Sequence, residues 1–135
     1  MNTEQHQIRG LGRALFQEAG DALFLLDPDN DRLLAVNPVA ERLTGLAREA
    51  LLGRPATYWF RFTGKGGQRL HHAATHSEIF HSQEGFLLRT AGGDGWLPVN
   101  VTIARLHVQP KPLALITVRD VREQREALTQ LKAKE

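Results

Sequence analysis

The sequence of 135 residues contains no cysteine. This absence excludes disulfide bonds, thiolate metal sites, thiol nucleophiles and photochemistry that forms a cysteinyl–flavin bond. No apolar run approaches the roughly 18 residues that a membrane-spanning helix needs. The first residues, Met-Asn-Thr-Glu-Gln-His-Gln, lack the basic-then-apolar order of a secretion signal. We therefore expect a cytoplasmic domain with no membrane contact in this segment.

Charge of one sign is also scarce. The 17 Lys and Arg residues nearly balance the 15 Asp and Glu residues, which leaves a net charge of +2. The positive charges are scattered, and no basic run alternates with aromatic residues as in nucleic-acid-binding segments. We therefore expect no nucleic-acid partner. The length fits one domain with a buried core.

Motifs for catalysis are missing as well. Gly64-Lys65 is not a phosphate-binding loop, because Trp59 occupies the position of the first glycine and Gly66 follows the lysine, where Ser or Thr is needed. A hairpin turn explains Gly92-Gly93-Asp94-Gly95. No Ser/His/Asp or paired-carboxylate arrangement is recognisable, so we expect no enzymatic activity in this chain.

The hydrophobic pattern predicts helices at both ends of the chain and strands between them. Ile8, Leu11 and Leu15 fall at helical spacing, and Asn37-Pro38 is typical of a helix N-terminus. The expected strands are 22–26, 32–36, 85–90, 95–106 and 112–120, and the expected helices after the first are 37–45, 48–52, 68–81 and 121–135. Residues 58–65 are predicted as a loop. This order indicates an α+β domain on an antiparallel sheet.

Three parts follow from this pattern. Residues 1–20 form an amphipathic flanking helix, residues 21–120 the core domain, and residues 121–135 a C-terminal linker helix. The sequence stops inside the predicted last helix, so we expect it to be a piece of a longer protein.

A series of motifs has a familiar order. The motifs are Asp21-Ala-Leu-Phe-Leu-Leu-Asp27, Asn37-Pro-Val-Ala-Glu-Arg-Leu-Thr-Gly45, Arg48-Glu-Ala-Leu-Leu-Gly53, Asp94-Gly95 and Val118-Arg-Asp-Val121. Over residues 15–124 the chain resembles the PAS domain family, the sensory-box domains of bacterial signalling proteins. Asp120-Val121-Arg122 departs from the family's frequent Asp-Ile-Thr. The resemblance implies a five-stranded antiparallel sheet in the order 2-1-5-4-3, with residues 112–120 as the central strand and short helices on one face.

The resemblance also implies a possible ligand pocket between the sheet and the helices. In the assumed register of the strands, the pocket candidates are Phe24, Leu26, Leu43, Tyr58, Phe86, Leu88, Thr90, Asn100, Thr102, Ile116 and Val118. Most of these residues are apolar, so a filled core is at least as good an interpretation as a pocket. Thr90, Asn100 and Thr102 are the polar groups that could orient a small-molecule ligand.

No cofactor is the leading expectation, with haem as the alternative. Haem needs an axial histidine, and among the histidines of the predicted helix 68–81 the candidates are His76 and His81. The simpler explanation is a polar helix surface that uses histidine. Flavin is disfavoured, because Asn100 matches a flavin-ring asparagine of the family while Thr90 and Val118 do not match the other positions. No metal site is expected otherwise.

The opposite face of the sheet is predicted to be apolar too. Its candidates for a dimer interface, together with the N-terminal helix, are Ile8, Leu11, Leu15, Leu97, Val99, Val101 and Leu115. An apolar patch of that size is rare on a monomer, so we expect a homodimer. The alternative is a monomer whose N-terminal helix covers its own sheet.

The functional hypothesis is a sensing and dimerisation module of a larger signalling protein, such as a histidine kinase, a cyclic-dinucleotide enzyme or a transcription regulator. Asp120 and Arg122, where the last strand meets the C-terminal helix, are the candidates for relaying a signal to a downstream effector domain. The alternatives are a haem-based gas or redox sensor and a ligand-free protein-interaction module.

Overall fold

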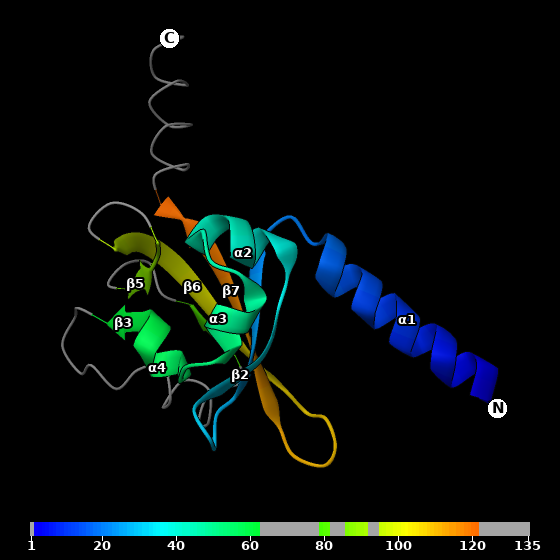
Figure 1. The fold of residues 1–135 in the computed structure, drawn as a ribbon. Coiled ribbons are helices and arrows are strands. Elements are labelled where there is room, and N and C mark those ends of the chain that lie inside the picture. The colour runs from blue at the N-terminus through cyan, green and yellow to red at the C-terminus, as the bar shows by residue number, and fades with distance from the viewer. Residues whose placement is uncertain (1, 63–78, 82–85, 92–94, 122–135) are drawn as a thin grey trace, which may run out of the picture.

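A curved antiparallel sheet of seven strands organises the part of the chain that the computed structural model describes, residues 2–62, 79–81, 86–91 and 95–121 (Figure 1). The strands are β1 (Ala22–Asp27), β2 (Arg32–Val36), β3 (Phe60–Phe62), β4 (Ile79–His81), β5 (Phe86–Arg89), β6 (Trp96–Leu106) and β7 (Leu113–Asp120). The helices are α1 (Asn2–Glu18), α2 (Pro38–Thr44), α3 (Arg48–Leu52) and α4 (Ala56–Trp59). None of these helices is both long enough and apolar enough to span a lipid bilayer.

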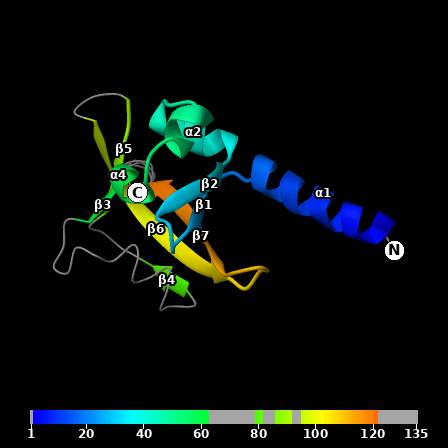
Figure 2. The ribbon, with the colours of Figure 1, turned by 60° about the horizontal axis from the view of Figure 1, so that its bottom comes forward.

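The strand order confirms the predicted fold. The sheet runs β2-β1-β7-β6-β5-β3, and its five longer strands reproduce the predicted order 2-1-5-4-3. The short helices cover one face, and α1 points away from the sheet (Figures 1 and 2). Because β7 lies between β1 and β6, a displacement of β7 changes the packing on both of its sides.

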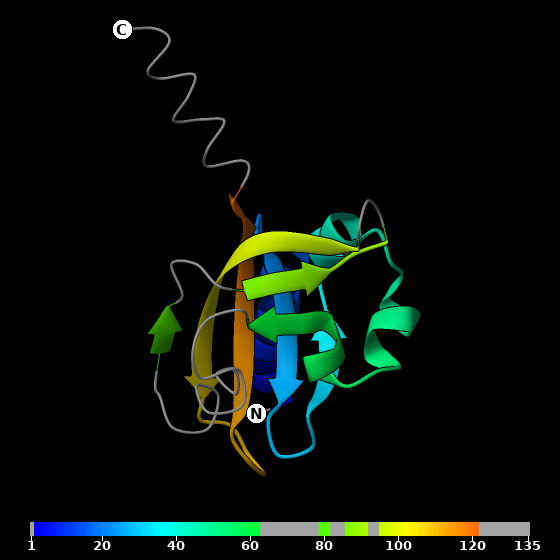
Figure 3. The ribbon, with the colours of Figure 1, turned by 90° about the vertical axis from the view of Figure 1, so that its left-hand side faces the viewer.

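Two short strands correct the predictions for the middle of the chain. Residues 60–62, predicted as part of a loop, form β3 because they pair with β5, with Phe60 opposite Leu88 (Figure 3). The predicted helix 68–81 is wrong at its end, where Ile79–His81 forms β4 beside β6; residues 68–78 lie outside the described part. Segments of three residues are too short for a periodic signal, and their long-range partners decide their structure. Of the predicted C-terminal helix, the described part includes Val121, and this residue is helical. Residues 122–135 lie outside the described part.

The inner face of the sheet carries the core. Along it, Phe24 is opposite Ile116 on β7, and Ile116 is opposite Ile103 on β6. These side chains are completely buried and belong to one continuous apolar cluster that includes Leu51, Trp59 and Phe60 from the covering elements.

Strand β6 lies with the opposite faces to those predicted. Val101 is paired with Val118, and Asn100 and Thr102 are paired with Arg119 and Thr117 on the outer face. The prediction that Asn100 and Thr102 point toward the helices is therefore wrong. Conversely, the proposed dimer residues Leu97, Val99 and Val101 are at most 6% exposed and lie in the core. A shift of one residue moves every side chain of a strand to the other face.

Candidate functional site

The predicted pocket residues are largely brought together, but as a packed core. Phe24, Leu26, Phe86, Leu88, Ile116 and Val118 are each at most 2% exposed. The rings of Phe24 and Phe60 meet edge to face, with centroids 5.2 Å apart. Leu43 and Tyr58 are half-buried at the margin of this core. Thr90 lies at the hairpin after β5, where its N–H donates to the carbonyl of Gly95 at 2.8 Å.

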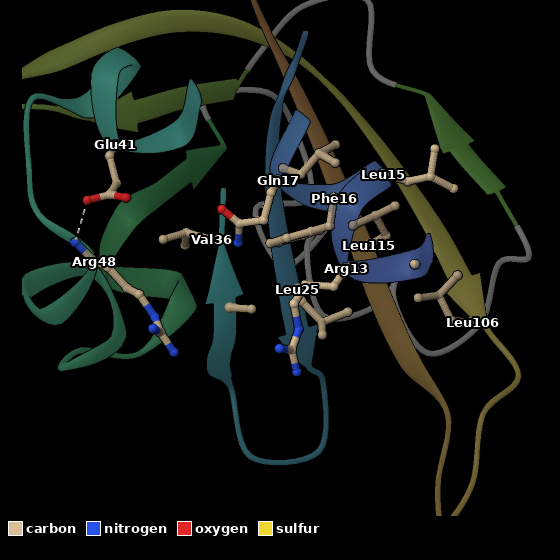
Figure 4. A pocket seen from close by; sticks show the side chains of 13 residues that line it. Arg13, Leu15, Phe16, Gln17, Leu25, Val36, Glu41, Arg48, Leu106 and Leu115 are labelled. Atoms are coloured by element: carbon tan, nitrogen blue, oxygen red, sulfur yellow. Dashed lines mark hydrogen bonds between the residues drawn. The ribbon is translucent and has the colours of Figure 1, made fainter. Parts of the chain in front are cut away.

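A groove of about 940 Å³ lies on the other side of the sheet, next to the C-terminal half of α1 (Figure 4). Its floor comes from β1, β2, β6 and β7, and its side from α1. The lining residues are Gly12, Arg13, Leu15, Phe16, Gln17, Leu23, Leu25, Ala35, Val36, Glu41, Arg48, Leu106 and Leu115. The floor is apolar, and charged side chains stand at its margins. At one margin the Oε2 atom of Glu41 accepts from the N–H of Arg48 at 3.2 Å.

The helix beside this groove exposes apolar side chains. Leu11 is 61% exposed and Leu15 is 64% exposed. Of the seven residues predicted for a dimer interface, Leu15 and Leu115 line the groove, and Leu11 lies on the same helix. Ile8 is placed in α1 by its backbone alone. Leu23 and Leu25, which strand alternation also predicts on the outer face, line the groove as well, and Leu106 is the strand residue of the lining that the sequence reasoning missed.

Asn37 joins α1 to the core. Its Oδ1 atom accepts from the N–H groups of Leu23 at 2.9 Å and Ala40 at 3.0 Å. Its Nδ2 atom donates to the carbonyls of Phe16 at 3.1 Å and Asp21 at 2.9 Å. The side chain is completely buried, its bonds to Leu23 and Ala40 are buried, and its bonds to Phe16 and Asp21 are partly buried. The sequence indicated the cap on α2 but not the bonds to the end of α1, because those partners lie up to 21 residues away.

The capped helix α2 also ends as the sequence predicts. Gly45 adopts the left-handed conformation with φ of 72°, and its N–H donates to the carbonyl of Glu41 at 2.8 Å. Next to it, the carbonyl of Thr44 accepts from the N–H of Ala91 at 2.8 Å. Helix α2 is thus fixed to β1 through Asn37 and to the β5–β6 hairpin through Thr44.

Asp27 connects two turns at one end of the sheet. Its carboxylate lies 2.8 Å from Nζ of Lys111 and accepts from Nδ2 of Asn30 at 2.8 Å. The hydrogen bond from Lys111 is the main cause that holds the pKa of Asp27 below its ordinary value of 3.8, and the bond from Asn30 adds to it. The β1–β2 turn is therefore tied to the β6–β7 turn by a charged pair.

Replacement of Asp27 by asparagine should lower the free energy of unfolding by about 1–2 kcal/mol at pH 7, because Lys111 loses a charged acceptor. A carboxyl whose pKa is lowered by folding stabilises the fold above its unfolded pKa, and this contribution is lost as the pH falls through the folded pKa. The difference between the native protein and Asp27→Asn should thus stay constant from neutral pH down to about pH 5 and shrink below about pH 4. Urea unfolding at several pH values measures this difference in free energy of unfolding. A difference that grows as the pH falls would contradict the role assigned to the Asp27–Lys111 pair.

The exit of β7 holds the predicted relay residue. Asp120 is the last residue of the strand and is half-buried. The preceding Arg119 pairs with Asp21 at 3.3 Å, which ties the exit of β7 to the residue before β1. Arg122 lies outside the described residues.

The histidines predicted for haem are not assembled on a helix in the described part. His81 lies in β4, and His76 falls outside the described residues. Among the residues that the structure describes, no group of three His, Asp or Glu side chains comes close enough to hold a metal ion.

The family model and the similar solved structures all indicate the same family. A family model described as "PAS domain" matches residues 20–123. The PAS domain of nitrogen regulation protein NR(II) from Vibrio parahaemolyticus superposes with a TM-score of 0.65 at 17% identity, covering 82% of this chain and 97% of that chain. The PAS domain of an HTR-like protein from Haloarcula marismortui gives 0.66 at 21% identity, covering 85% and 98%.

A domain of a sensory box sensor histidine kinase/response regulator from Geobacter sulfurreducens is similar as well. It gives a TM-score of 0.64 at 20% identity, covering 84% of this chain and 95% of that chain. At these identities the three structures bear on the fold alone. No curated protein matches the chain in sequence.

Proposed function

Because the chain belongs to the PAS domain family, we propose that it is the sensing and dimerisation module of a larger signalling protein. In this proposal the module has no catalytic activity of its own and works in the cytoplasm. An effector domain elsewhere in the parent protein, such as a histidine kinase, a cyclic-dinucleotide enzyme or a transcription regulator, produces the output.

The groove beside α1 supports the dimer. Its floor, with Leu23, Leu25 and Leu115, is apolar, and the adjacent helix exposes Leu11 and Leu15. Large side chains that are more than half exposed gain free energy when a partner covers them, at roughly 25 cal/mol per Å². In a second copy of the chain, α1 carries the same exposed leucines, and these can cover the apolar floor of the groove. A symmetric exchange of the two helices would cover both grooves.

The position of β7 supports a relay. Leu115 contributes to the groove, while the next residue, Ile116, belongs to the core. A change on either face therefore acts on the same strand, which ends at Asp120. In our proposal Asp120 and Arg122 pass this change to the segment that follows.

The packed core favours one of the two alternatives. Phe24, Leu88 and Ile116 are completely buried among apolar neighbours, as expected for an interaction module without a ligand. The haem alternative depended on a helix carrying His76 and His81, and His81 is in a strand. A haem absorption band in protein expressed with added haem would revive that alternative.

The substitution Leu15→Glu should weaken the dimer by about tenfold or more, because it places a charge in an apolar interface. Val108→Glu is the matched control, since Val108 is an exposed apolar residue on the β6–β7 turn that does not line the groove. Sedimentation equilibrium over a range of protein concentrations measures both. The dimer proposal fails if the native protein stays monomeric at high concentration, or if the two variants weaken association equally.

A further inference from the structure

Three arginines and two aromatic side chains stack in alternation beside β3 and β5. The guanidinium carbon of Arg89 lies 4.2 Å from the ring centre of Tyr58 and 4.5 Å from that of Trp96. Arg54 lies over the same Tyr58 ring at 4.7 Å, and Arg61 lies over Trp96 at 5.8 Å. We call these five residues the arginine–aromatic series.

The series has a fixed centre and two exposed ends. Arg89 is half-buried between the rings, and its Nε atom donates to the carbonyl of Tyr58 at 3.0 Å. Arg54 and Arg61 are exposed. A guanidinium that lies over a ring uses its flat face for the contact and leaves N–H donors at its edge. The arrangement therefore holds positively charged donors in a restricted geometry at the surface.

The stretch of sequence that supplies the series is poor in acidic residues. Residues 54–119 contain eight Lys and Arg residues but three Asp and Glu residues, whereas residues 1–53 contain five and eight. Between Arg54 and Arg119 the described part of the chain has no acidic residue at all. Asp31 reaches the start of α4, but its carboxylate accepts from the N–H of Thr57 at 3.1 Å and from its hydroxyl at 2.5 Å. The small net charge of the whole chain thus conceals a stretch of sequence, residues 54–119, in which positive charges outnumber negative ones.

We propose that the arginine–aromatic series binds an aspartate- and glutamate-rich segment of another protein. Carboxylates fit the free edges of guanidinium groups, because each can accept two parallel N–H bonds. Each ring of the series already has two guanidinium groups over it. Nucleic-acid bases would need exposed ring faces for stacking, so the geometry favours carboxylates over a single-stranded nucleic acid.

The test is fluorescence anisotropy with a labelled glutamate–glycine peptide of about ten residues, titrated with the full chain at low salt and at about 0.15 M salt, where the Debye length is ~8 Å. We expect saturable binding that weakens as salt is added. Arg54→Gln and Arg61→Gln should each weaken binding by about fivefold or more. Arg42→Gln removes one positive charge from an exposed site on α2 and should leave the affinity within about twofold.

Any of the following results would overturn the proposal. Failure of the native protein to bind the peptide, or equal weakening by all three variants, would show that the series is not a site. Tighter binding of a single-stranded RNA of the same length, lost in Arg54→Gln and Arg61→Gln, would assign the surface to nucleic acid. Because both substituted arginines are exposed, thermal unfolding of the variants should match the native protein, and Arg89 is left intact for its bond to Tyr58. The peptide titration compares variants of this surface with the native protein whether or not the protein forms a dimer, so its failure is distinguishable from a failure of the dimer proposal.

Discussion

Replacing Asn37 by alanine is expected to lower the free energy of unfolding by about 3–5 kcal/mol, from the loss of a helix cap and of buried hydrogen bonds. The substitution removes the partner of two N–H groups and two carbonyls at once. The side chain is completely buried, so water replaces its buried bonds to Leu23 and Ala40 poorly. A domain of this size has a total stability of about 5–15 kcal/mol, and the variant should therefore be close to unfolding at 37 °C.

Asn37→Asp makes the matched comparison. It keeps an oxygen that accepts from Leu23 and Ala40 but sets its second oxygen against the carbonyls of Phe16 and Asp21. The variant should be destabilised at pH 7 and recover partly as the pH falls, because a protonated carboxyl can again donate to a carbonyl. Urea unfolding of both variants measures these effects, with the exposed Gln109→Ala as a control.

Hydrogen exchange adds a local readout for Asn37. The amides around the end of α1 and the start of β1 should exchange faster in Asn37→Ala, because Phe16 and Asp21 lose the donor that holds their carbonyls. A stability loss below about 1 kcal/mol, or protection that is unchanged at the end of α1, would contradict the role assigned to Asn37.

Replacing Phe24 by alanine should cost about 3–5 kcal/mol. The ring is completely buried and meets Phe60 edge to face, so its removal leaves a cavity in a core that can collapse only partly. Leu11→Ala, at a position 61% exposed on α1, should change stability by less than about 0.5 kcal/mol in the monomer. Chemical denaturation at low protein concentration compares the two.

This result also bears on the ligand question. If the space next to Phe24 were loosely packed, its lining would adjust and the loss would fall below about 2 kcal/mol. A loss in the full range supports a core that is filled by the protein's own side chains, and thus the interaction module among the alternatives.

The helix α2 and the strand order could be predicted because their signals are local. Asn37, Pro38 and Gly45 mark both ends of the helix by their own conformational preferences. The strands that proved correct are long enough to show apolar residues between turn residues. The strands β3 and β4 each contain three residues, and neither has a pattern of its own.

The faces of β6 were predicted wrongly for a different reason. The register assumed for this strand placed Asn100 and Thr102 toward the helices. The strand's own alternation favours the observed arrangement, since Leu97, Val99, Val101 and Ile103 are apolar and Asn100 and Thr102 are not. The pattern within the strand was the better guide, because burial of apolar residues decides which face points inward.

The two surfaces could not be predicted in full because their residues are far apart in the sequence. The groove combines α1 with four strands, and the amphipathic character of α1 does not say where the helix lies. The arginine–aromatic series takes Arg54, Tyr58, Arg61, Arg89 and Trp96 from separate parts of the chain. These residues form no basic run in the sequence. They come together only when the sheet folds.

The pairing of β1 with β7 has a consequence for engineering. Ala22 is opposite Val118, so the chain enters and leaves the core about 5 Å apart, the spacing of paired strands. Asp21 and Arg119 join the same two points with an ion pair. Residues 20–121 should therefore be transplantable into a surface loop of an unrelated host protein with little distortion of the host.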